Sequence, residues 1–120
     1  MDLFDESYEG LTANWIMKAY WDSIYSCGLF VKAACSVSNR EGLSVDGAYC
    51  RFPDPNGWSE EDLFEGVEFG YGSPGIDLLN MIVSEAACAE VLMEACRRYL
   101  VRHPKDQALL QDAMDRIREW

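Results

Sequence analysis

Histidine, paired cysteines and long apolar segments are scarce or missing in this chain. It has a single histidine, and none of its 5 cysteines forms a Cys-x-x-Cys pair, so it lacks the close ligand pairs of a structural zinc site. No apolar run reaches the roughly 18 residues that span a membrane. The acidic N-terminus has neither the basic start nor the apolar stretch of a secretory signal. We therefore expect a cytoplasmic protein without metal, cofactor or membrane contact.

Positive charge is also scarce. The chain has 21 acidic side chains and 10 lysines and arginines, which gives a net charge of −11. A phosphate backbone or an anionic membrane attracts a cationic surface, so this composition argues against direct binding to either. A basic protein remains a suitable partner, because a surface of one charge sign speeds association with its opposite.

The residues that are present describe one soluble globular domain. Of the 120 residues, 49% are hydrophobic and 26% charged, and a chain of this size can bury one real core. We expect residues 1–120 to form a single domain. The five cysteines are an odd number and read as reduced thiols of a cytosolic core, namely Cys27, Cys35, Cys50, Cys88 and Cys96.

The first half of the chain alternates between helical and extended patterns. Apolar residues at steps of three and four predict a helix over residues 12–27. Residues 29–37 fit both a strand and a helix, and their Ala and Lys content favours a short helix. Residues 44–52 contain β-formers and predict a single strand. The segment Pro53-Asp54-Pro55-Asn56-Gly57 ends that strand, because proline cannot continue a hydrogen-bonded ladder.

Two further strands and two helices follow. Alternation over residues 63–71 predicts a strand, the glycine-rich segment 70–75 a turn, and the apolar run 76–83 another strand. Ser84 is placed to cap a helix over about residues 85–102. The pair His103-Pro104 breaks this helix, and Pro104 opens the last one, whose predicted apolar face consists of Leu109, Leu110, Ala113, Met114, Ile117 and Trp120.

These elements predict an α+β fold. Short connections between the strands favour an antiparallel meander, so we expect a small antiparallel sheet of about three strands with the helices packed on one face.

No motif indicates catalysis. His103 lies in the turn between two helices, where a capping or surface role is expected. The string Gly70-x-Gly72-x-x-Gly75 leads into a strand rather than a helix, which is typical of a hairpin and not of a dinucleotide site. Asp54-x-Asn56-Gly57 lacks the spacing and flanking helices of a calcium loop. We therefore expect no catalytic residues and no enzymatic activity.

Recognition of a protein remains the best-supported kind of function. Most of the negative charge lies in residues 1–77, and its densest part runs from Asp54 to Glu68 without a lysine or arginine. Trp58 lies within this stretch and Tyr71 in the following turn; each is expected either to fold back on the sheet or to anchor a partner. The predicted partner-binding residues are Asp54, Trp58, Glu60, Glu61, Asp62, Glu65, Glu68 and Tyr71.

Several segments resemble one protein family. The stretch Phe64-Glu65-Gly66-Val67-Glu68-Phe69 is followed by a turn, an apolar strand, and a helix that ends Ala95-Cys96-Arg97-Arg98-Tyr99-Leu100 before His103-Pro104. With the segment from Val45 to Pro53, this arrangement resembles the immunity proteins of contact-dependent growth inhibition (CDI), of the type that opposes ribonuclease toxins.

The resemblance implies a bacterial protein that binds the C-terminal nuclease domain of a toxin delivered by a neighbouring cell and occludes its active site. The implied toxin is a ribonuclease that cuts tRNA, with an EndoU-like fold as one form. Because each such protein matches its own toxin, no binding residue is carried over from the family.

Two other classes remain open. One is an acidic adaptor or nucleic-acid mimic that binds another basic host protein. The other is a small cysteine enzyme, which would need a reactive thiol with a depressed pKa.

Overall fold

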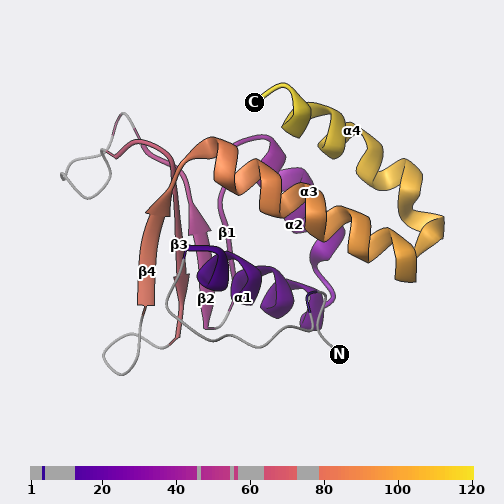
Figure 1. Ribbon diagram of the computed structural model, residues 1–120, viewed down its shortest axis with the longest axis horizontal. Helices are drawn as coiled ribbons and strands as arrows, with labels where there is room; N and C mark the ends of the chain where they lie inside the picture. Colours follow the sequence, from indigo (N-terminus) through magenta and orange to yellow (C-terminus); the bar gives the residue numbers. More distant parts are fainter. Residues whose placement is uncertain (1–3, 5–12, 46, 55, 57–63, 73–78) are drawn as a thin grey trace.

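The computed structural model describes residue 4 and residues 13–45, 47–54, 56, 64–72 and 79–120. Within these residues the chain forms four α-helices and one four-stranded antiparallel sheet, and the helices lie on one side of the sheet (Figure 1). The predicted α+β fold is therefore confirmed, with one strand more than expected.

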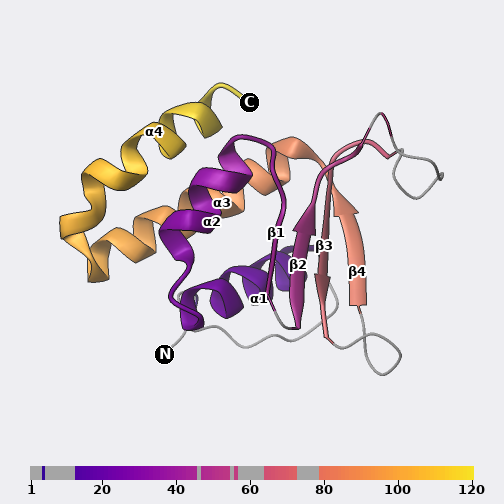
Figure 2. The ribbon, with the colours of Figure 1, turned by 180° about the vertical axis from the view of Figure 1, so that it is seen from behind.

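The sheet is a meander in which each strand pairs only with its neighbours in the chain. Its strands are β1 (Leu43–Val45), β2 (Ala48–Arg51), β3 (Val67–Tyr71) and β4 (Leu79–Val83), in the order β1-β2-β3-β4. Every pair is antiparallel. Figure 2 shows the four strands side by side from the other side of the molecule.

The additional strand comes from a hairpin inside residues 44–52, which the sequence predicted as a single strand. Val45 pairs with Ala48, so the chain reverses between these two residues. Gly47 has a φ of +88°, a conformation that glycine adopts without the clash a Cβ atom would cause. An Asp-Gly pair between β-forming residues is a strong hairpin signal, and it is the signal that the single-strand interpretation overlooked.

The helices agree closely with the sequence predictions. They are α1 (Ala13–Ser26), α2 (Phe30–Ser38), α3 (Glu85–Arg102) and α4 (Gln107–Arg118), with a short 3₁₀ helix, η2 (Pro104–Asp106), before α4. Ser84 caps α3 as predicted, because its side chain accepts a hydrogen bond of 3.1 Å from the backbone N–H of Ala87.

The core lies between the inner face of the sheet and the helices. Helix α1 contacts β2, β3 and β4, α3 contacts α1, and α4 packs on α2 and α3. The ring of Tyr20 from α1 meets Phe69 of β3 at 5.3 Å and Trp21 at 5.0 Å, edge to face in both cases. All three side chains are fully buried, so the aromatic face of α1 joins the sheet to the helical layer.

The N-terminal segment is attached to this layer through Phe4. Its backbone N–H donates to Asp22 at 3.1 Å, and Arg98 of α3 donates to its carbonyl oxygen at 2.8 Å. The Arg98 guanidinium also lies 4.9 Å from the centre of the Phe4 ring. Phe4 is 2% exposed, which makes it a core residue.

Two sequence predictions need correction. The strand expected from residue 63 begins at Val67, because residues 65 and 66 form a bend in which Gly66 has a φ of +104°. Leu109, placed on the apolar face of the last helix, is 58% exposed. The buried residues of α4 recur at steps of three and four from Leu110, and Leu109 falls beside that stripe.

None of the helices in the described part of the chain is long and apolar enough to cross a membrane.

Candidate functional site

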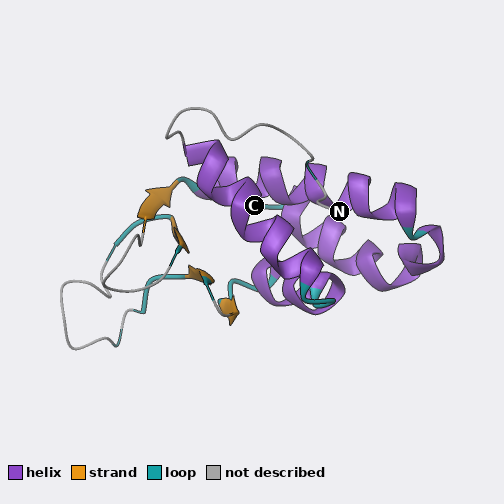
Figure 3. Ribbon diagram, turned by 90° about the horizontal axis from the view of Figure 1, so that it is seen from below, coloured by secondary structure: helices purple, strands orange, loops and turns teal. Residues whose placement is uncertain are grey.

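The sheet has an outer face that none of the helices in the described residues covers, as Figure 3 shows from below. Along β2 and β3 the residues Ala48, Cys50, Val67 and Phe69 are buried against the helices, so the residues between them point outward. The strand register arranges the outward residues in two rows, which are Ser44–Tyr49–Gly70–Asn80 and Arg51–Glu68–Ile82. We call this surface the outer sheet face.

Glu68 organises the centre of the outer sheet face. Its carboxylate accepts a hydrogen bond from the Tyr49 hydroxyl and one of 3.1 Å from the Arg51 guanidinium, which also forms an ion pair with it. The Glu68 side chain is 13% exposed and that of Arg51 37% exposed. The Arg51 guanidinium also lies 5.1 Å from the centre of the Phe64 ring. These contacts hold a tyrosine and an arginine in fixed positions on an otherwise open surface.

The titration of this cluster follows from its contacts. Burial opposes the charge of Glu68, but the hydrogen bonds from Arg51 and Tyr49 outweigh that effect and hold the pKa of Glu68 below its usual value. Burial and the hydrogen bond to Glu68 raise the pKa of Tyr49. At neutral pH the carboxylate is therefore ionised and the phenol carries its proton.

Gly70 allows the Tyr49 ring to lie flat on the sheet. A Cβ atom at residue 70 would come within 2.0 Å of Tyr49 Cε1, so a larger residue would displace the ring. Tyr49 and Gly70 are direct cross-strand partners. This close approach is the structural reason for glycine in the middle of β3.

The structure describes four of the predicted partner-binding residues. Asp54 and Glu65 are exposed, on the segments that leave β2 and enter β3. Glu68 is on the outer sheet face, but Arg51 and Tyr49 already occupy its carboxylate. Tyr71 is the last residue of β3 rather than part of a turn; its ring packs edge to face on Trp15 at 5.8 Å and is 37% exposed. The others lie outside the described residues: Trp58, Glu60, Glu61 and Asp62.

The sequence alone did not predict Tyr49, Arg51, Asn80 or Ile82 as site residues. The overlooked signal was the Asp-Gly pair at positions 46 and 47 of the sequence, because the alternation of β2 can be assigned to faces only when its partner strands are known. Ile82 is 50% exposed, between Met81, which is partly buried against the core, and the core residue Val83.

The predicted calcium-loop fragment has a purely local role. The Asp54 carboxylate accepts a hydrogen bond of 2.9 Å from the backbone N–H of Asn56, which is an Asx turn. Among the described residues, no group of three or more His, Cys, Asp or Glu side chains is placed to hold a metal ion.

Comparison with known proteins identifies the family. The family model described as CDI immunity protein matches residues 13–114, which is most of the chain. The chain belongs to the CDI immunity protein family. The solved structure of an immunity protein from Neisseria meningitidis has the same fold, with a TM-score of 0.70, 14% sequence identity, and coverage of 85% of this chain and 86% of that chain. No curated protein matches the sequence.

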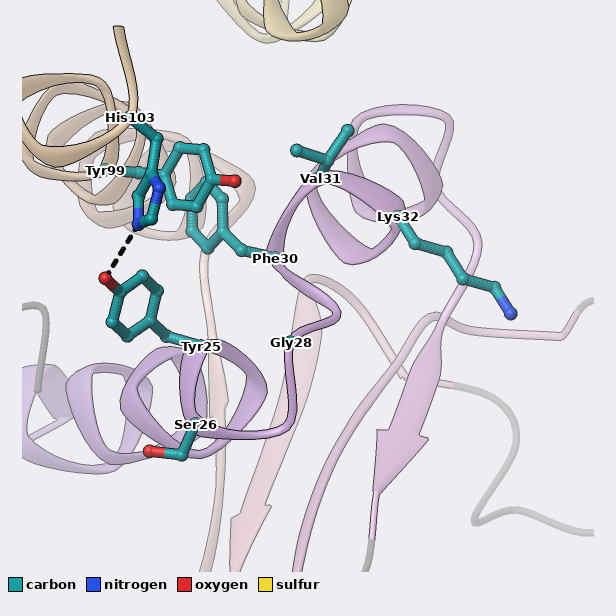
Figure 4. A pocket seen from close by; sticks show the side chains of 8 residues that line it. All are labelled: Tyr25, Ser26, Gly28, Phe30, Val31, Lys32, Tyr99 and His103. Carbon is teal, nitrogen blue, oxygen red and sulfur yellow. Dashed lines mark hydrogen bonds between the residues drawn. The ribbon is translucent and has the colours of Figure 1, made fainter. Parts of the chain in front are cut away.

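The immunity protein also has a pocket of about 470 Å³, lined by residues of α1, α2 and α3 and of the segments that follow α1 and α3. Figure 4 shows its aromatic wall, where the Tyr99 ring stacks between Phe30 and His103 at 4.5 Å from each. The Tyr25 hydroxyl and His103 Nε2 are 2.9 Å apart and hydrogen-bonded. Burial and a hydrogen bond to Asp106 raise the pKa of Tyr99 to about 12.

His103 has the structural role that its sequence position predicted. It is the C-cap of α3, and its backbone N–H donates to the carbonyl of Tyr99 at 2.8 Å. The ring of this exposed residue completes the aromatic stack. Tyr25 of α1 and Tyr99 of α3 both contact the imidazole. Through these described contacts, His103 links the two helices.

Three of the five thiols are core residues of the immunity protein, as expected, and they are Cys50, Cys88 and Cys96. Burial raises the pKa of Cys88 and Cys96 to about 12, and that of Cys50 further. These thiols are protonated at neutral pH, whereas a catalytic cysteine needs a lowered pKa. Cys35 is partly buried and Cys27 is exposed, so the prediction of a buried thiol is wrong for Cys27.

Proposed function

We propose that this immunity protein binds the C-terminal ribonuclease domain of its cognate CDI toxin in the cytoplasm and neutralises it by covering the active site. The observation that supports the proposal most strongly is the family match over residues 13–114. The partner in this proposal is the nuclease domain itself, and the immunity protein acts stoichiometrically, without a cofactor and without contacting nucleic acid.

The charge of the chain suits such a partner. A ribonuclease holds RNA in a cationic cleft, because the phosphate backbone dominates nucleic-acid binding. A protein with a net charge of −11 can present carboxylates where the phosphates would lie. Charge of this kind increases the association rate and excludes wrong partners more than it adds affinity.

The residues proposed to contact the toxin are those of the acidic stretch and its aromatic neighbours. Exposed Asp54 and Glu65 would pair with lysine or arginine at the rim of the cleft. Trp58 would supply buried apolar area, together with the exposed part of Tyr71. Glu60, Glu61 and Asp62 would add charge to the same rim. Glu68 would act mainly by positioning Arg51 and Tyr49, which already contact its carboxylate.

The first experiment is co-purification of this chain with the C-terminal domain of the protein encoded immediately upstream, followed by an RNA-cleavage assay. A tight complex that silences cleavage is the expected result, and tRNA compared with other RNA reveals the substrate. An upstream product that is no nuclease, or one whose activity the immunity protein leaves unchanged, contradicts the proposal. Binding to several unrelated cationic proteins with similar affinity would instead favour the acidic adaptor or nucleic-acid mimic.

Substitutions then test the proposed residues. Trp58→Ala should weaken binding by about 2 kcal/mol or more if Trp58 is a buried anchor. Asp54→Asn with Glu65→Gln should mainly slow association and reduce its salt dependence. The matched control is Glu90→Gln with Asp112→Asn, which removes two exposed carboxylates from α3 and α4 and should leave the association rate near that of the wild type.

A further inference from the structure

We propose that the toxin domain docks on the outer sheet face, with Ile82 near the centre of the contact. This inference rests on the proposed function, because its partner is the same basic nuclease domain. It adds a surface that the acidic stretch alone does not define, formed by Tyr49, Arg51, Asn80 and Ile82.

The first observation is the position of the exposed apolar side chains. Among the described residues, the exposed large hydrophobic side chains are Tyr71, Ile82, Val101 and Leu109. Ile82 alone in this group lies on the outer sheet face, next to Glu68 in the strand register. Val101 belongs to α3 and Leu109 to α4. An apolar side chain beside ordered polar groups fits the usual composition of an interface, in which a polar rim flanks an apolar core.

The second observation is that the polar groups around Ile82 are already ordered. Glu68 holds both Arg51 and Tyr49, and the Tyr49 ring lies against Gly70. Tyrosine and arginine are the residue types that most often dominate binding energy. Side chains fixed before binding lose less conformational freedom when the partner arrives. The Tyr49 and Arg51 side chains are therefore already in place for binding in the free protein.

The third observation is the charge on the two sides of the molecule. Arg51 of β2 pairs with Glu68 of β3 at one end of the sheet. Asp54 follows β2 and Glu65 precedes β3, so these two exposed residues lie beyond that same end. The row that contains Ile82 is at this end. In contrast, α3, η2 and α4 together have no net charge, because six cations (Arg97, Arg98, Arg102, Lys105, Arg116 and Arg118) are balanced by six carboxylates (Glu85, Glu90, Glu94, Asp106, Asp112 and Asp115).

This distribution suits a basic partner better at the outer sheet face than at the helical layer. A cationic toxin domain that approaches the outer sheet face meets exposed Asp54 and Glu65 at the rim, whereas one that approaches α3 and α4 meets a layer without net charge. Opposite charges across an interface speed association and help to select the partner. Charge complementarity therefore favours the outer sheet face over the helical layer.

The test compares two apolar-to-arginine substitutions on opposite sides of the molecule. Ile82→Arg places a cation at the centre of the proposed contact, and we expect it to raise the Kd for the toxin domain about tenfold or more. Leu109→Arg is the matched control, since Leu109 is 58% exposed and Ile82 50%; its Kd should stay within about twofold of wild type. Thermal unfolding of both variants shows whether either substitution disturbs the fold.

A second variant keeps the test independent of Ile82. Asn80 is exposed in the other outward row, and Asn80→Lys should also raise the Kd. If the wild type binds and inhibits the toxin while Ile82→Arg and Asn80→Lys bind equally well, the docking surface is wrong and the proposed function stands. If Leu109→Arg is the variant that weakens binding, the helical layer is the interface. If the wild type does not bind, the proposed function itself fails.

Discussion

Strand β3 presents Val67 and Phe69 to the helices, and Glu68 and Gly70 to the opposite side of the sheet. The two inward side chains are fully buried among apolar groups. Glu68, in contrast, is held by Arg51 and Tyr49, both from β2. The inner face is thus specified by volume and hydrophobicity, and the outer face by directional polar contacts.

This contrast separates what maintains the fold from what is available to a partner. A change on the inner face leaves a cavity or a clash in a packed core. A change on the outer sheet face leaves that core intact and alters the shape and charge presented to solvent. The outer sheet face can therefore change its contacts with a partner without unfolding the protein.

The largest expected effect comes from breaking the inner face. Phe69→Ala removes a fully buried ring that contacts Tyr20, and it should lower the free energy of unfolding by about 3–5 kcal/mol. Ile82→Ala, on the opposite face, should cost about 1 kcal/mol or less. Urea denaturation of the two variants measures both values, and equal losses would contradict the division between the faces.

A smaller effect should follow from Gly70→Ala on the outer sheet face. The new methyl group would displace the Tyr49 ring and with it the hydrogen bond to Glu68, at a cost of about 1–2 kcal/mol. The same substitution in a Tyr49→Ala background should cost almost nothing, because the clash is gone. Denaturation of the four proteins of this cycle gives the coupling, and additive losses would show that Tyr49 is not the cause.

The Glu68 cluster should make stability depend weakly on pH. The pKa of Glu68 is lower in the folded than in the unfolded chain, so its contribution is complete above the unfolded value of about 4.3 and is lost as pH falls through the folded value. At neutral pH the free energy of unfolding of the wild type should exceed that of Glu68→Gln by about 1 kcal/mol or less. Urea denaturation across this pH range should show the difference shrink in acid.

Glu65→Gln is the control for this pH dependence. Glu65 is exposed, and its replacement should change the free energy of unfolding by no more than about 0.5 kcal/mol. If the difference in free energy of unfolding between wild type and Glu68→Gln grows as pH falls, the folded state does not lower the pKa of Glu68.

The smallest effect concerns the thiols. Iodoacetamide should label exposed Cys27 in the folded protein, whereas the inner-face Cys50 and the α3 residues Cys88 and Cys96 should react only after denaturation. Mass spectrometry of the modified peptides measures each rate. Rapid labelling of a buried thiol at neutral pH would support the cysteine-enzyme hypothesis. As a control, Cys27→Ser should leave toxin neutralisation unchanged.

The sequence predicted best the elements whose signals are local. Helix α3 was located because its cap at Ser84 and its apolar stripe both lie within the segment. The hairpin of β1 and β2 was missed because residues 44–52 also fit one continuous strand. Leu109 was misplaced because one position along a helix turns a side chain by about a quarter of a circle.

The candidate site was less predictable than the fold. The acidic stretch was visible as composition, but the contact between Arg51 and Glu68 joins residues from different strands. Which residues share the outer sheet face depends on the register of three strand pairs. The sequence alone shows which residues alternate along each strand. It does not show which residues of different strands lie side by side on the sheet.

The order of the strands also affects how quickly the protein becomes functional. Each strand of the meander pairs with the strand beside it in the chain, and pairing between neighbouring segments favours faster folding than pairing between distant ones. A cell exposed to a toxin is protected by the immunity protein that has already folded. Pairing between successive strands thus favours a short interval in which a new molecule offers no protection.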